Sequence, residues 1–538
     1  MNSMDLRGIC PLTCDEALRR AAAIAPALEA VVKGSERITF GELSAEVERI
    51  RGALVATGVR KGDHVGICLG NGPLWVALFL AIGSAGAVAV PINTRFRAEE
   101  MAYALRQSKT SFLFLVDRFL KTDFAEMLRR MCPAVDRELP DEALPDLREV
   151  VVVGEDVPPG ARSFRSFLAA ADGPVQARCD PEDTLLIQYT SGTTAYPKGV
   201  MLTHRGMCAD GFFSGLRMGL RLGDRFHSAR PFFHVAGTSL SILASIQNLA
   251  TLVTMDRFEP QEALKVMEEE RCTHFSGNDT IALMLLGHPD RPERKLSLRG
   301  GWLAASPTVV RRVVEELGAR ECVTGYGLSE ASPNVAQSSW WEPLEVRQAA
   351  LMAPEPGVDV RIVDPETHEP LPTGEKGEIL VRGWNVMQGY FGMPTETAAA
   401  LSDDGWLATG DLGRLDDAGR LEFAGRVKEL IRVGGENVAP AEVEDIILRH
   451  PRIRQAAVVG VPDQRLVEVP FAFVVLTEGD AVGEDELLGW ARANMAGFKV
   501  PRHLRVVDGF EEIGMTASSK VQKSQLAAHA VRLLEADD

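Results

Sequence analysis

The most constraining feature of the chain is a polar loop that follows a short apolar run. Residues 189–200 read Tyr-Thr-Ser-Gly-Thr-Thr-Ala-Tyr-Pro-Lys-Gly-Val, and residues 184–188 before them have strand character. From Thr190 to Lys198 the loop holds four serine and threonine hydroxyls, a glycine and a lysine. Such a loop can turn N–H groups, hydroxyls and one ammonium group toward a polyphosphate. Its spacing is not that of a P-loop, and similar clusters form ordinary loops, so the stretch alone leaves both interpretations open.

Length and composition predict a multidomain globular protein. The chain has 538 residues, too many for one ordinary core, and 46% of them are hydrophobic and 25% charged. The formal net charge of −17 argues against a nucleic-acid-binding surface. The eight cysteines lack paired metal-ligand spacing, so free thiols in a reducing cytoplasm are expected.

The sequence also argues against stable membrane insertion. The N-terminus is polar and lacks the apolar region of a signal peptide. The most apolar run, residues 74–90, contains Gly83, Ser84 and Gly86 and ends at Pro91, which makes it marginal as a bilayer span. A buried helix that leads into a buried strand is the favoured interpretation, and a cytoplasmic protein is expected.

The order of apolar segments predicts an α/β fold with two domains. From about residue 37 to 330, strand-like runs such as 64–69 and 150–153 alternate with helix-periodic segments such as 44–57 and 98–108. Residues 358–381 change to short strands with turns, which indicates a small β subdomain. A new pattern of strand, glycine turn, helix and strand begins at Gly425. We therefore expect a large N-terminal domain of layered α/β sheets, residues 1–425, and a small α+β domain, residues 426–538.

The polar loop resembles the phosphate-loop signature of the adenylate-forming enzymes, a superfamily that includes the acyl-CoA synthetases. That signature runs Tyr-Thr-Ser-Gly-Thr-Thr-Gly-x-Pro-Lys-Gly, and this chain departs from it at Ala195, whose Cβ disfavours a positive φ. Five later stretches resemble further motifs of the superfamily in the right order: 231–237, 323–331, 405–413, 425–438 and 515–523. The resemblance spans essentially the whole chain and implies an AMP-binding domain followed by a mobile C-terminal domain.

The resemblance implies a set of nucleotide-binding and catalytic residues. Tyr326 would stack on adenine, Asp411 and Arg426 would contact the ribose, and Glu330 with Thr194 would bind Mg²⁺. The ATP- and AMP-binding residues are Thr190, Ser191, Gly192, Thr193, Thr194, Tyr326, Gly327, Ser329, Asp411 and Arg426, and the catalytic residues are Lys198, His234, Glu330 and Lys520. Ser329, Gly514 and Ser519 replace the family's usual Thr, Pro and Gly. Taken singly, His234 also fits a core histidine, Asp411 a turn residue and Lys520 a solvated lysine.

The resemblance implies the acyl and CoA sites as well. Phe232, Phe233, Ser276, Gly277, Trp302 and Ala304 would line the acyl pocket. Amino-acid-activating relatives carry an aspartate after the aromatic pair, whereas this chain continues Val235-Ala-Gly, so a plain carboxylic acid is expected. Trp302 stands where many relatives have a small residue, and it either shortens the pocket or is buried scaffold. Lys428 would be the hinge pivot, and Gly434 and Gly435 would approach CoA.

The sequence is thus interpreted as an acyl-CoA synthetase that uses ATP, CoA and Mg²⁺. The expected substrate is an apolar acid of moderate size: medium-chain, alicyclic or aromatic. Two alternatives stay open, an acyl-AMP ligase that serves a carrier protein and a catalytically silent nucleotide-binding relative. The expected partners are the small-molecule acid, ATP and CoA, with no nucleic acid. The oligomeric state cannot be read from the sequence, and a homodimer is one of the states open to it.

Overall fold

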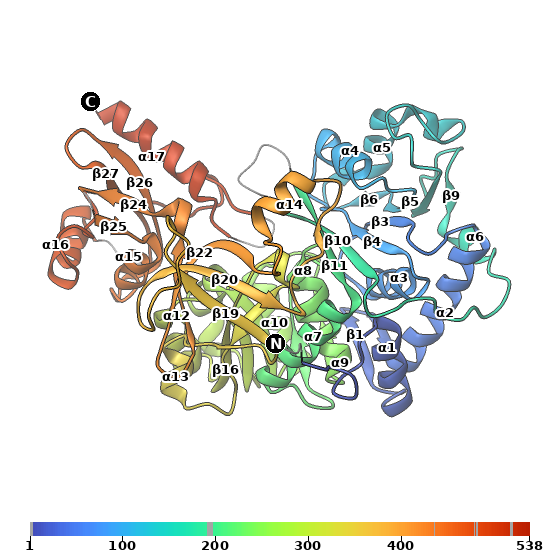
Figure 1. Cartoon of the computed structure of the whole chain (residues 1–538), viewed down its shortest axis with the longest axis horizontal. Helices are drawn as coiled ribbons and strands as arrows, with labels where there is room; N and C mark the ends of the chain where they lie inside the picture. Colours follow the sequence, from blue (N-terminus) through green and yellow to red (C-terminus); the bar gives the residue numbers. More distant parts are fainter. Residues whose placement is uncertain are drawn as a thin grey trace.

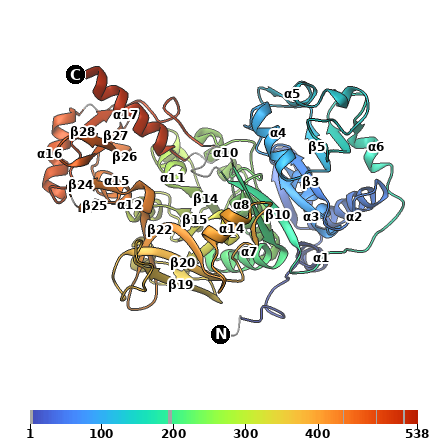
Figure 2. The same cartoon turned by 45° about the horizontal axis from the view of Figure 1, so that its top comes forward.

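The structure, a computed structural model, describes residues 4–190, 197–434, 436–477, 479, 482–516 and 520–537. It places the C-terminal segment at one end of the molecule. In Figures 1 and 2 this segment, coloured orange-red to red, lies opposite the sheet that contains β3 (His64–Cys68) and β5 (Phe112–Val116). The middle of the chain forms a second large sheet between these two parts.

An eight-stranded sheet carries the polar loop of the sequence. Its strands are parallel from β10 to β9, and antiparallel pairing joins β11 to β10 and to β21. Across the sheet the order is β21 (Gly389–Tyr390), β11 (Lys198–Thr203), β10 (Thr184–Thr190), β4 (Val88–Pro91), β3, β5, β8 (Glu149–Val153) and β9 (Arg162–Ser163).

A nine-stranded sheet forms the second layer. Its central strands, from β16 to β1, are parallel, and antiparallel strands close both edges. The order is β18 (Ala353–Pro354), β17 (Asn334–Gln337), β16 (Glu321–Gly327), β15 (Gly300–Ala304), β14 (His274–Asn278), β12 (Arg225–His227), β13 (Thr251–Val253), β1 (Glu29–Lys33) and β2 (Glu36–Thr39).

Two smaller sheets follow along the chain. The antiparallel one consists of β19 (Val358–Val363), β20 (Gly377–Gly383), β22 (Leu407–Leu415) and β23 (Leu421–Arg426). The C-terminal one consists of β25 (Glu436–Val438), β24 (Ile431–Val433), β27 (Val467–Leu476) and β26 (Ile453–Asp463), with β28 (His503–Val506) beside β27. The short strands β6 (Arg118–Phe119) and β7 (Thr122–Asp123) pair separately.

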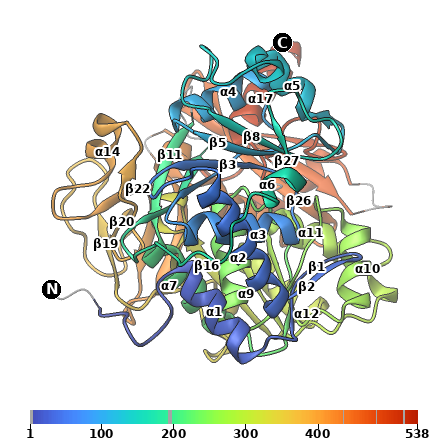
Figure 3. The ribbon, with the colours of Figure 1, turned by 90° about the vertical axis from the view of Figure 1, so that its right-hand side faces the viewer.

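Helices pack between and around these sheets. The largest cluster of buried residues joins the two large sheets through α2, α3 and α7, and α1, α2 and α3 lie side by side (Figure 3). The helices are α1 (Cys14–Ile24), α2 (Phe40–Ala56), α3 (Pro73–Ser84), α4 (Ala98–Gln107), α5 (Phe124–Met131), α6 (Phe164–Leu168), α7 (His204–Met218), α9 (Ala244–Gln247), α10 (Pro260–Glu269), α11 (Asp279–Leu286), α12 (Pro307–Glu316), α13 (Leu344–Gln348), α14 (Pro394–Ala400), α15 (Pro440–Ile447), α16 (Glu484–Asn494) and α17 (Lys523–Asp537).

The structure confirms the predicted fold class, a mixed α/β protein with a large N-terminal and a smaller C-terminal domain. The apolar run at 74–90 is helix α3 followed by strand β4, and residues Trp75 to Ser84 are buried. Proline at the first position suits the start of a helix, and an all-apolar helix must be covered on every side. Among the described residues, no helix is both long and apolar enough to cross a bilayer.

Candidate active site

The strands β10 and β11, which flank the polar loop in the sequence, pair with each other as an antiparallel hairpin. Thr190 ends the first strand and pairs with Lys198, which begins the second. Both side chains are half-buried. Ser191, Gly192, Thr193 and Thr194 lie outside the described residues, so their predicted phosphate contacts and the Mg²⁺ role of Thr194 stay predictions.

A carboxylate, a phenol and an ammonium group meet beside this hairpin. Tyr390 lies on β21 and donates a hydrogen bond from its hydroxyl to Glu330 Oε1 at 2.9 Å. Lys198 Nζ lies 4.7 Å from the centroid of the Tyr390 ring. Burial and the charge of Glu330 raise the pKa of Tyr390, so the phenol stays protonated and keeps its donor. Sequence reasoning missed Tyr390, because only the pairing of β21 with β11 brings it here.

The predicted adenine and ribose residues form a second polar group. The Tyr326 hydroxyl donates to Asp411 Oδ2 at 2.9 Å, and Arg426 Nε lies 3.3 Å from Asp411 Oδ1. Asp411 and Arg426 are direct partners in the β22–β23 ladder. Burial raises the pKa of the Asp411 carboxyl, and the charge of Arg426 opposes that shift. Phe423 stacks on the Tyr326 ring with centroids 5.4 Å apart, so a stacked base would have to use the other face.

The main chain of Lys520 is hydrogen-bonded to Thr516, which also contacts the N-terminal part of the chain. Its N–H donates to Thr516 Oγ1 at 3.0 Å, and Thr516 N donates back to Lys520 O at 2.8 Å. Arg95, from the N-terminal part of the chain, donates to Thr516 O at 3.1 Å. The Lys520 side chain keeps access to solvent, yet the surrounding protein and the charge of Arg426 lower its pKa. The charges of Arg426 and Asp411 both act on the Lys520 ammonium group, so Lys520 lies in the neighbourhood of this ion pair.

His234 is held as a neutral imidazole near the same place. It caps the short helix α8 (Val235–Gly237), and its Nδ1 accepts a hydrogen bond from Ala236 N at 3.2 Å. Because Nδ1 is an acceptor, the proton of the neutral ring lies on Nε2. Burial lowers the pKa of His234 to about 4, and the positive charges of Arg230 and Lys520 act in the same direction. The ring can thus donate a hydrogen bond from Nε2 but is a poor base at neutral pH.

The predicted acyl-pocket residues divide between the sheet face and the core. Ser276 and Trp302 are cross-strand partners on β14 and β15, and both are buried. Ala304, two residues after Trp302, is exposed at the strand end. A Cβ at Gly277 would meet Ile281 at 2.9 Å, which places Gly277 against α11. Phe232 is fully buried, with its ring 5.5 Å from that of Trp75, whereas the Phe233 carbonyl accepts from Gln188 Nε2 at 2.9 Å.

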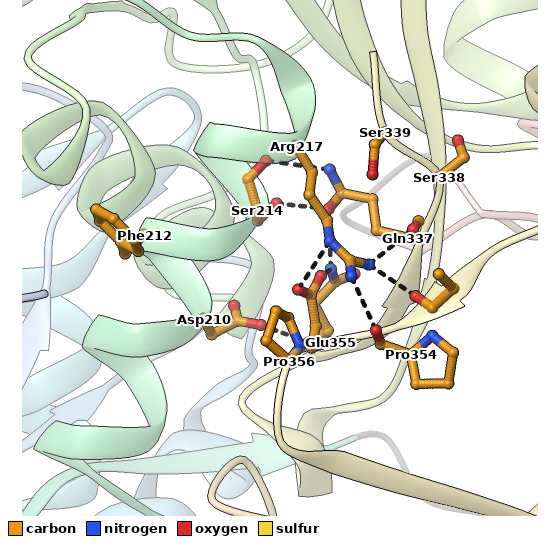
Figure 4. Close-up of polar contacts among 12 residues, drawn as sticks. Asp210, Phe212, Ser214, Arg217, Gln337, Ser338, Ser339, Pro354, Glu355 and Pro356 are labelled. Atoms are coloured by element: carbon orange, nitrogen blue, oxygen red, sulfur yellow. Dashed lines mark hydrogen bonds and ion pairs between the residues drawn. The ribbon is translucent and has the colours of Figure 1, made fainter. Parts of the chain in front are cut away.

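Trp302 is fixed by a buried polar network that the sequence did not reveal. Figure 4 shows the part of this network around Ser214, Arg217 and Gln337. Its indole Nε1 donates to Gln337 Oε1 at 3.0 Å, and the same oxygen accepts from Ser214 Oγ at 2.8 Å. Arg217 donates to the carbonyls of Gln337, Ala353 and Pro354 and lies 3.4 Å from Glu355 Oε2. These residues join α7 to β17 and β18, and through Gln337 the network fixes the orientation of the Trp302 indole.

The predicted hinge lies in a single turn of 3₁₀ helix. Lys428 is the middle residue of η5 (Val427–Glu429), which connects β23 to β24. Gly434 has a φ of +58° in the turn after β24, and its N–H donates to Leu466 O at 2.8 Å. An L residue rarely adopts this φ, which explains glycine here. Gly435 lies outside the described residues, and the predicted CoA contact of both glycines stays a prediction.

The side chains around Glu330 fit Mg²⁺ better than a metal ion whose ligands must all come from the protein. Glu330 Oε1 is occupied by Tyr390, which turns the carboxylate so that Oε2 is the oxygen left for a cation. The described residues contain no group of three or more metal-binding side chains. A cation at Glu330 would therefore take most of its ligands from phosphate oxygens and water, as Mg²⁺ commonly does.

Comparison with known proteins places these features in one family. The model of the AMP-binding enzymes matches residues 18–391, and the model of their C-terminal domain matches residues 442–520. The 3-[(3aS,4S,7aS)-7a-methyl-1,5-dioxo-octahydro-1H-inden-4-yl]propanoyl:CoA ligase of Rhodococcus jostii is 37% identical, over 96% of this chain and 98% of the relative. The mitochondrial medium-chain acyl-CoA ligase ACSF2 of Mus musculus is 32% identical, over 96% and 87%.

A solved structure agrees with the sequence relatives. The anthranilate CoA ligase AuaEII in complex with anthranoyl-AMP superimposes with a TM-score of 0.87 at 26% identity, over 98% of this chain and 99% of that one. ATP and CoA are the co-substrates of such acyl-CoA synthetases. The chain therefore belongs to the AMP-binding enzymes of the adenylate-forming superfamily and is an AMP-forming acid–CoA ligase.

Proposed function

We propose that the enzyme activates an apolar carboxylic acid of moderate size as its acyl-AMP and then forms the CoA thioester. The observation that carries this proposal is the ion pair of Asp411 with Arg426, together with the charge of Lys520, which acts both on Asp411 and on the neutral His234. A carboxylate is a poor electrophile, so its oxygen first attacks the α-phosphorus of ATP and pyrophosphate leaves. The CoA thiolate then attacks the acyl carbonyl and AMP leaves.

The residues stabilise charge and position the reactants rather than exchange protons. Lys520 supplies a cation beside the α-phosphate, and Lys198 supplies one at the β- and γ-phosphates. Because His234 Nδ1 accepts from Ala236, Nε2 carries the proton of the neutral ring, and we assign this N–H as a donor to an oxygen of the acid's carboxyl group. Asp411 and Arg426 hold the ribose, which fixes the α-phosphate relative to the acid. Mg²⁺ bound at Glu330 would supply neutralisation of phosphate charge.

Three features support an apolar acid of moderate size. The aromatic pair is followed by Val235, so no carboxylate stands ready for an amino group. The buried Trp302 occupies the sheet face beside Ser276 and limits the depth available there. The relatives named above act on a bicyclic propanoyl acid and on medium-chain acids, which are substrates of this size class.

A panel of carboxylic acids tests the proposal. Acid-dependent ATP–pyrophosphate exchange reports the first half-reaction, and AMP release with CoA reports the whole reaction. Activation of C6–C12, alicyclic or aromatic acids in preference to acetate and amino acids is expected. Exchange without thioester formation, together with acyl transfer to an added carrier protein, would instead identify an acyl-AMP ligase. Absence of exchange with every acid would leave a nucleotide-binding protein.

A further inference from the structure

The guanidinium group of Arg230 differs from those of the other buried arginines, because its buried Nη1 has no hydrogen-bond partner among the described residues. In the part of the chain that the structure describes, four arginines are buried: Arg51, Arg217, Arg230 and Arg347. Arg51 bonds Asp15 and the Val175 carbonyl, and Arg217 and Arg347 each donate to several main-chain carbonyls. In the described part of the chain, Arg230 Nη1 is buried and donates to nothing. A buried unsatisfied donor of this kind is rare and needs an explanation.

The surroundings of Arg230 keep it charged without satisfying it. The guanidinium lies over the Trp302 ring, with Cζ 4.4 Å from the ring centroid, which gives a cation–π contact. Burial lowers the pKa of Arg230 to about 9, so the side chain remains a cation at neutral pH. No carboxylate among the described residues compensates this charge. The Trp302 ring face attracts the cation, but the N–H bonds of the guanidinium group lie in its own plane and do not point at the ring. The N–H donors of Arg230 therefore stay available for another acceptor.

A second unsatisfied polar group lies on the same face of the sheet. Ser276 Oγ is buried and has no hydrogen-bond partner among the described residues. Ser276 pairs with Trp302 across β14 and β15, and partners in a parallel ladder point to one face. Arg230 follows β12, the strand beside β14, so the cation and the hydroxyl flank the same indole. Gln337 fixes that indole, which makes the arrangement rigid.

We infer that the otherwise apolar acyl group carries one oxygen acceptor, a ketone or second carboxylate remote from the activated carboxyl group, and that Arg230 binds it with Ser276. This inference rests on the proposed function, because it assigns one part of the same acyl site. His234 lies four residues further along the chain, and the charge of Arg230 contributes to the lowering of its pKa, which places the two side chains in one region of the site. The forked donors of arginine match a carboxylate or a carbonyl oxygen well.

Matched acids test the inference in the unmodified enzyme. Each plain acid from hexanoate to dodecanoate is compared with its oxo-acid and its dicarboxylate of equal chain length, and the same is done with cyclohexanepropanoate and its 4-oxo derivative. At the best length, kcat/KM for an oxygenated acid should exceed that for the plain acid by about 10–100-fold, the range expected for one hydrogen bond to a charged group. The two oxygenated series distinguish a ketone from a carboxylate.

The variant Arg230→Met should reduce the ratio of kcat/KM for the oxygenated acid to kcat/KM for the plain acid to about 1. Arg230→Lys should give an intermediate ratio, because lysine keeps the positive charge but lacks the forked N–H donors of the guanidinium group. Ser276→Ala should lower the ratio severalfold. Ser245→Ala is its matched control, since Ser245 Oγ is equally buried and unpartnered but lies on α9, and its ratio should equal that of the wild type. Melting curves show whether each variant is folded.

Each outcome decides the inference. If the wild-type enzyme shows a ratio of kcat/KM, oxygenated over plain acid, at or below 1 at every chain length, the inference is overturned without any variant. The inference is also overturned if Arg230→Met or Arg230→Lys slows plain and oxygenated acids equally. Equal slowing would assign Arg230 to the reacting carboxylate or to a phosphate. If plain acids are activated but no oxygenated acid is preferred, only this inference fails. If no acid at all supports pyrophosphate exchange, the proposed function has failed.

Discussion

The hydrogen bond from Tyr390 to Glu330 allows a sharp test of the predicted Mg²⁺ ligand. The change Tyr390→Phe removes the hydroxyl that donates to Glu330 Oε1 at 2.9 Å and keeps the ring beside Lys198. A hydrogen bond to a charged group contributes about 1.5–3 kcal/mol, which corresponds to about 10–150-fold in rate if it orients the carboxylate for catalysis. We expect adenylation to slow by that factor and the Mg²⁺ concentration for half-maximal rate to rise.

A second substitution separates the hydroxyl from the ring. Tyr390→Leu also removes the contact with Lys198 Nζ, 4.7 Å from the ring centroid. At a partly exposed site a cation–π contact contributes about 0.5–1 kcal/mol, so a further loss of about 2–5-fold is expected. That further loss should appear in the KM for ATP, since Lys198 is predicted to hold phosphates, and not in the Mg²⁺ dependence.

ATP–pyrophosphate exchange, measured over a series of Mg²⁺ concentrations at saturating acid, provides the readout. Tyr103→Phe is the matched control, because Tyr103 donates to the Pro197 carbonyl in the same hairpin at 3.2 Å. It should leave the Mg²⁺ dependence at the wild-type value. If Tyr390→Phe keeps the wild-type rate and Mg²⁺ dependence, or if both variants shift them equally, Tyr390 does not orient a metal ligand.

Four further predictions follow from individual residues. Lys520→Ala should slow acyl-AMP formation by about 10²–10³-fold and leave thioester formation from supplied acyl-AMP nearly unchanged; equal loss in both steps would contradict its assignment. Trp302→Gly should shift kcat/KM toward longer acids, with a melting curve to detect the roughly 3–5 kcal/mol that truncation of a buried Trp can cost; an unchanged profile in a folded variant would make Trp302 scaffold. Lys428→Pro should spare single-turnover pyrophosphate release but slow thioester formation steeply, and a wild-type thioester rate would exclude the pivot. Finally, the pKa of the buried His227 is about 4 when folded and about 6.5 when unfolded, so the unfolded chain binds the proton first and stability is lost as pH falls from about 6.5 toward 4. At pH 5 the loss in the free energy of unfolding amounts to about 2 kcal/mol. Between pH 7 and 5, the free energy of unfolding of His227→Gln, measured with urea, should therefore fall by about 2 kcal/mol less than that of the wild type.

The layered fold could be predicted because its signals are local. An all-apolar segment that ends at Pro91 can only be buried, and the structure shows the helix and strand expected there. The expected helix at 440–449 and strand at 456–461 are also confirmed, as α15 and β26. Strand ends shift by one to three residues, because pairing with a neighbour, rather than the strand's own sequence, determines where a ladder stops.

The contacts within the site depend on register and could not be predicted. Tyr390 and Glu330 are 60 residues apart, and Tyr326 and Asp411 are 85 apart. The network behind Trp302 joins Ser214 to Gln337 across 123 residues, and neither residue belongs to a recognisable motif. Arg230 carried no signal either, because a surface arginine and a buried unpaired one are identical in sequence. Motif resemblance therefore identified candidate residues, whereas only the folded chain shows which of them share a hydrogen bond.

The contacts on either side of Lys428 limit where a rotation of the C-terminal domain could occur. Upstream, Arg426 pairs with Asp411 in the β22–β23 ladder, so it belongs to the preceding sheet. Downstream, Lys523 Nζ lies 2.9 Å from Glu444 and 3.6 Å from Glu429, and these carboxylates raise its pKa despite burial. Glu429 is thereby tied to α15 and α17 of the C-terminal domain. Only Val427 and Lys428 lie between the two anchored residues, so a rotation that replaced Lys520 by the Gly434 turn would have to be absorbed by their backbone dihedrals.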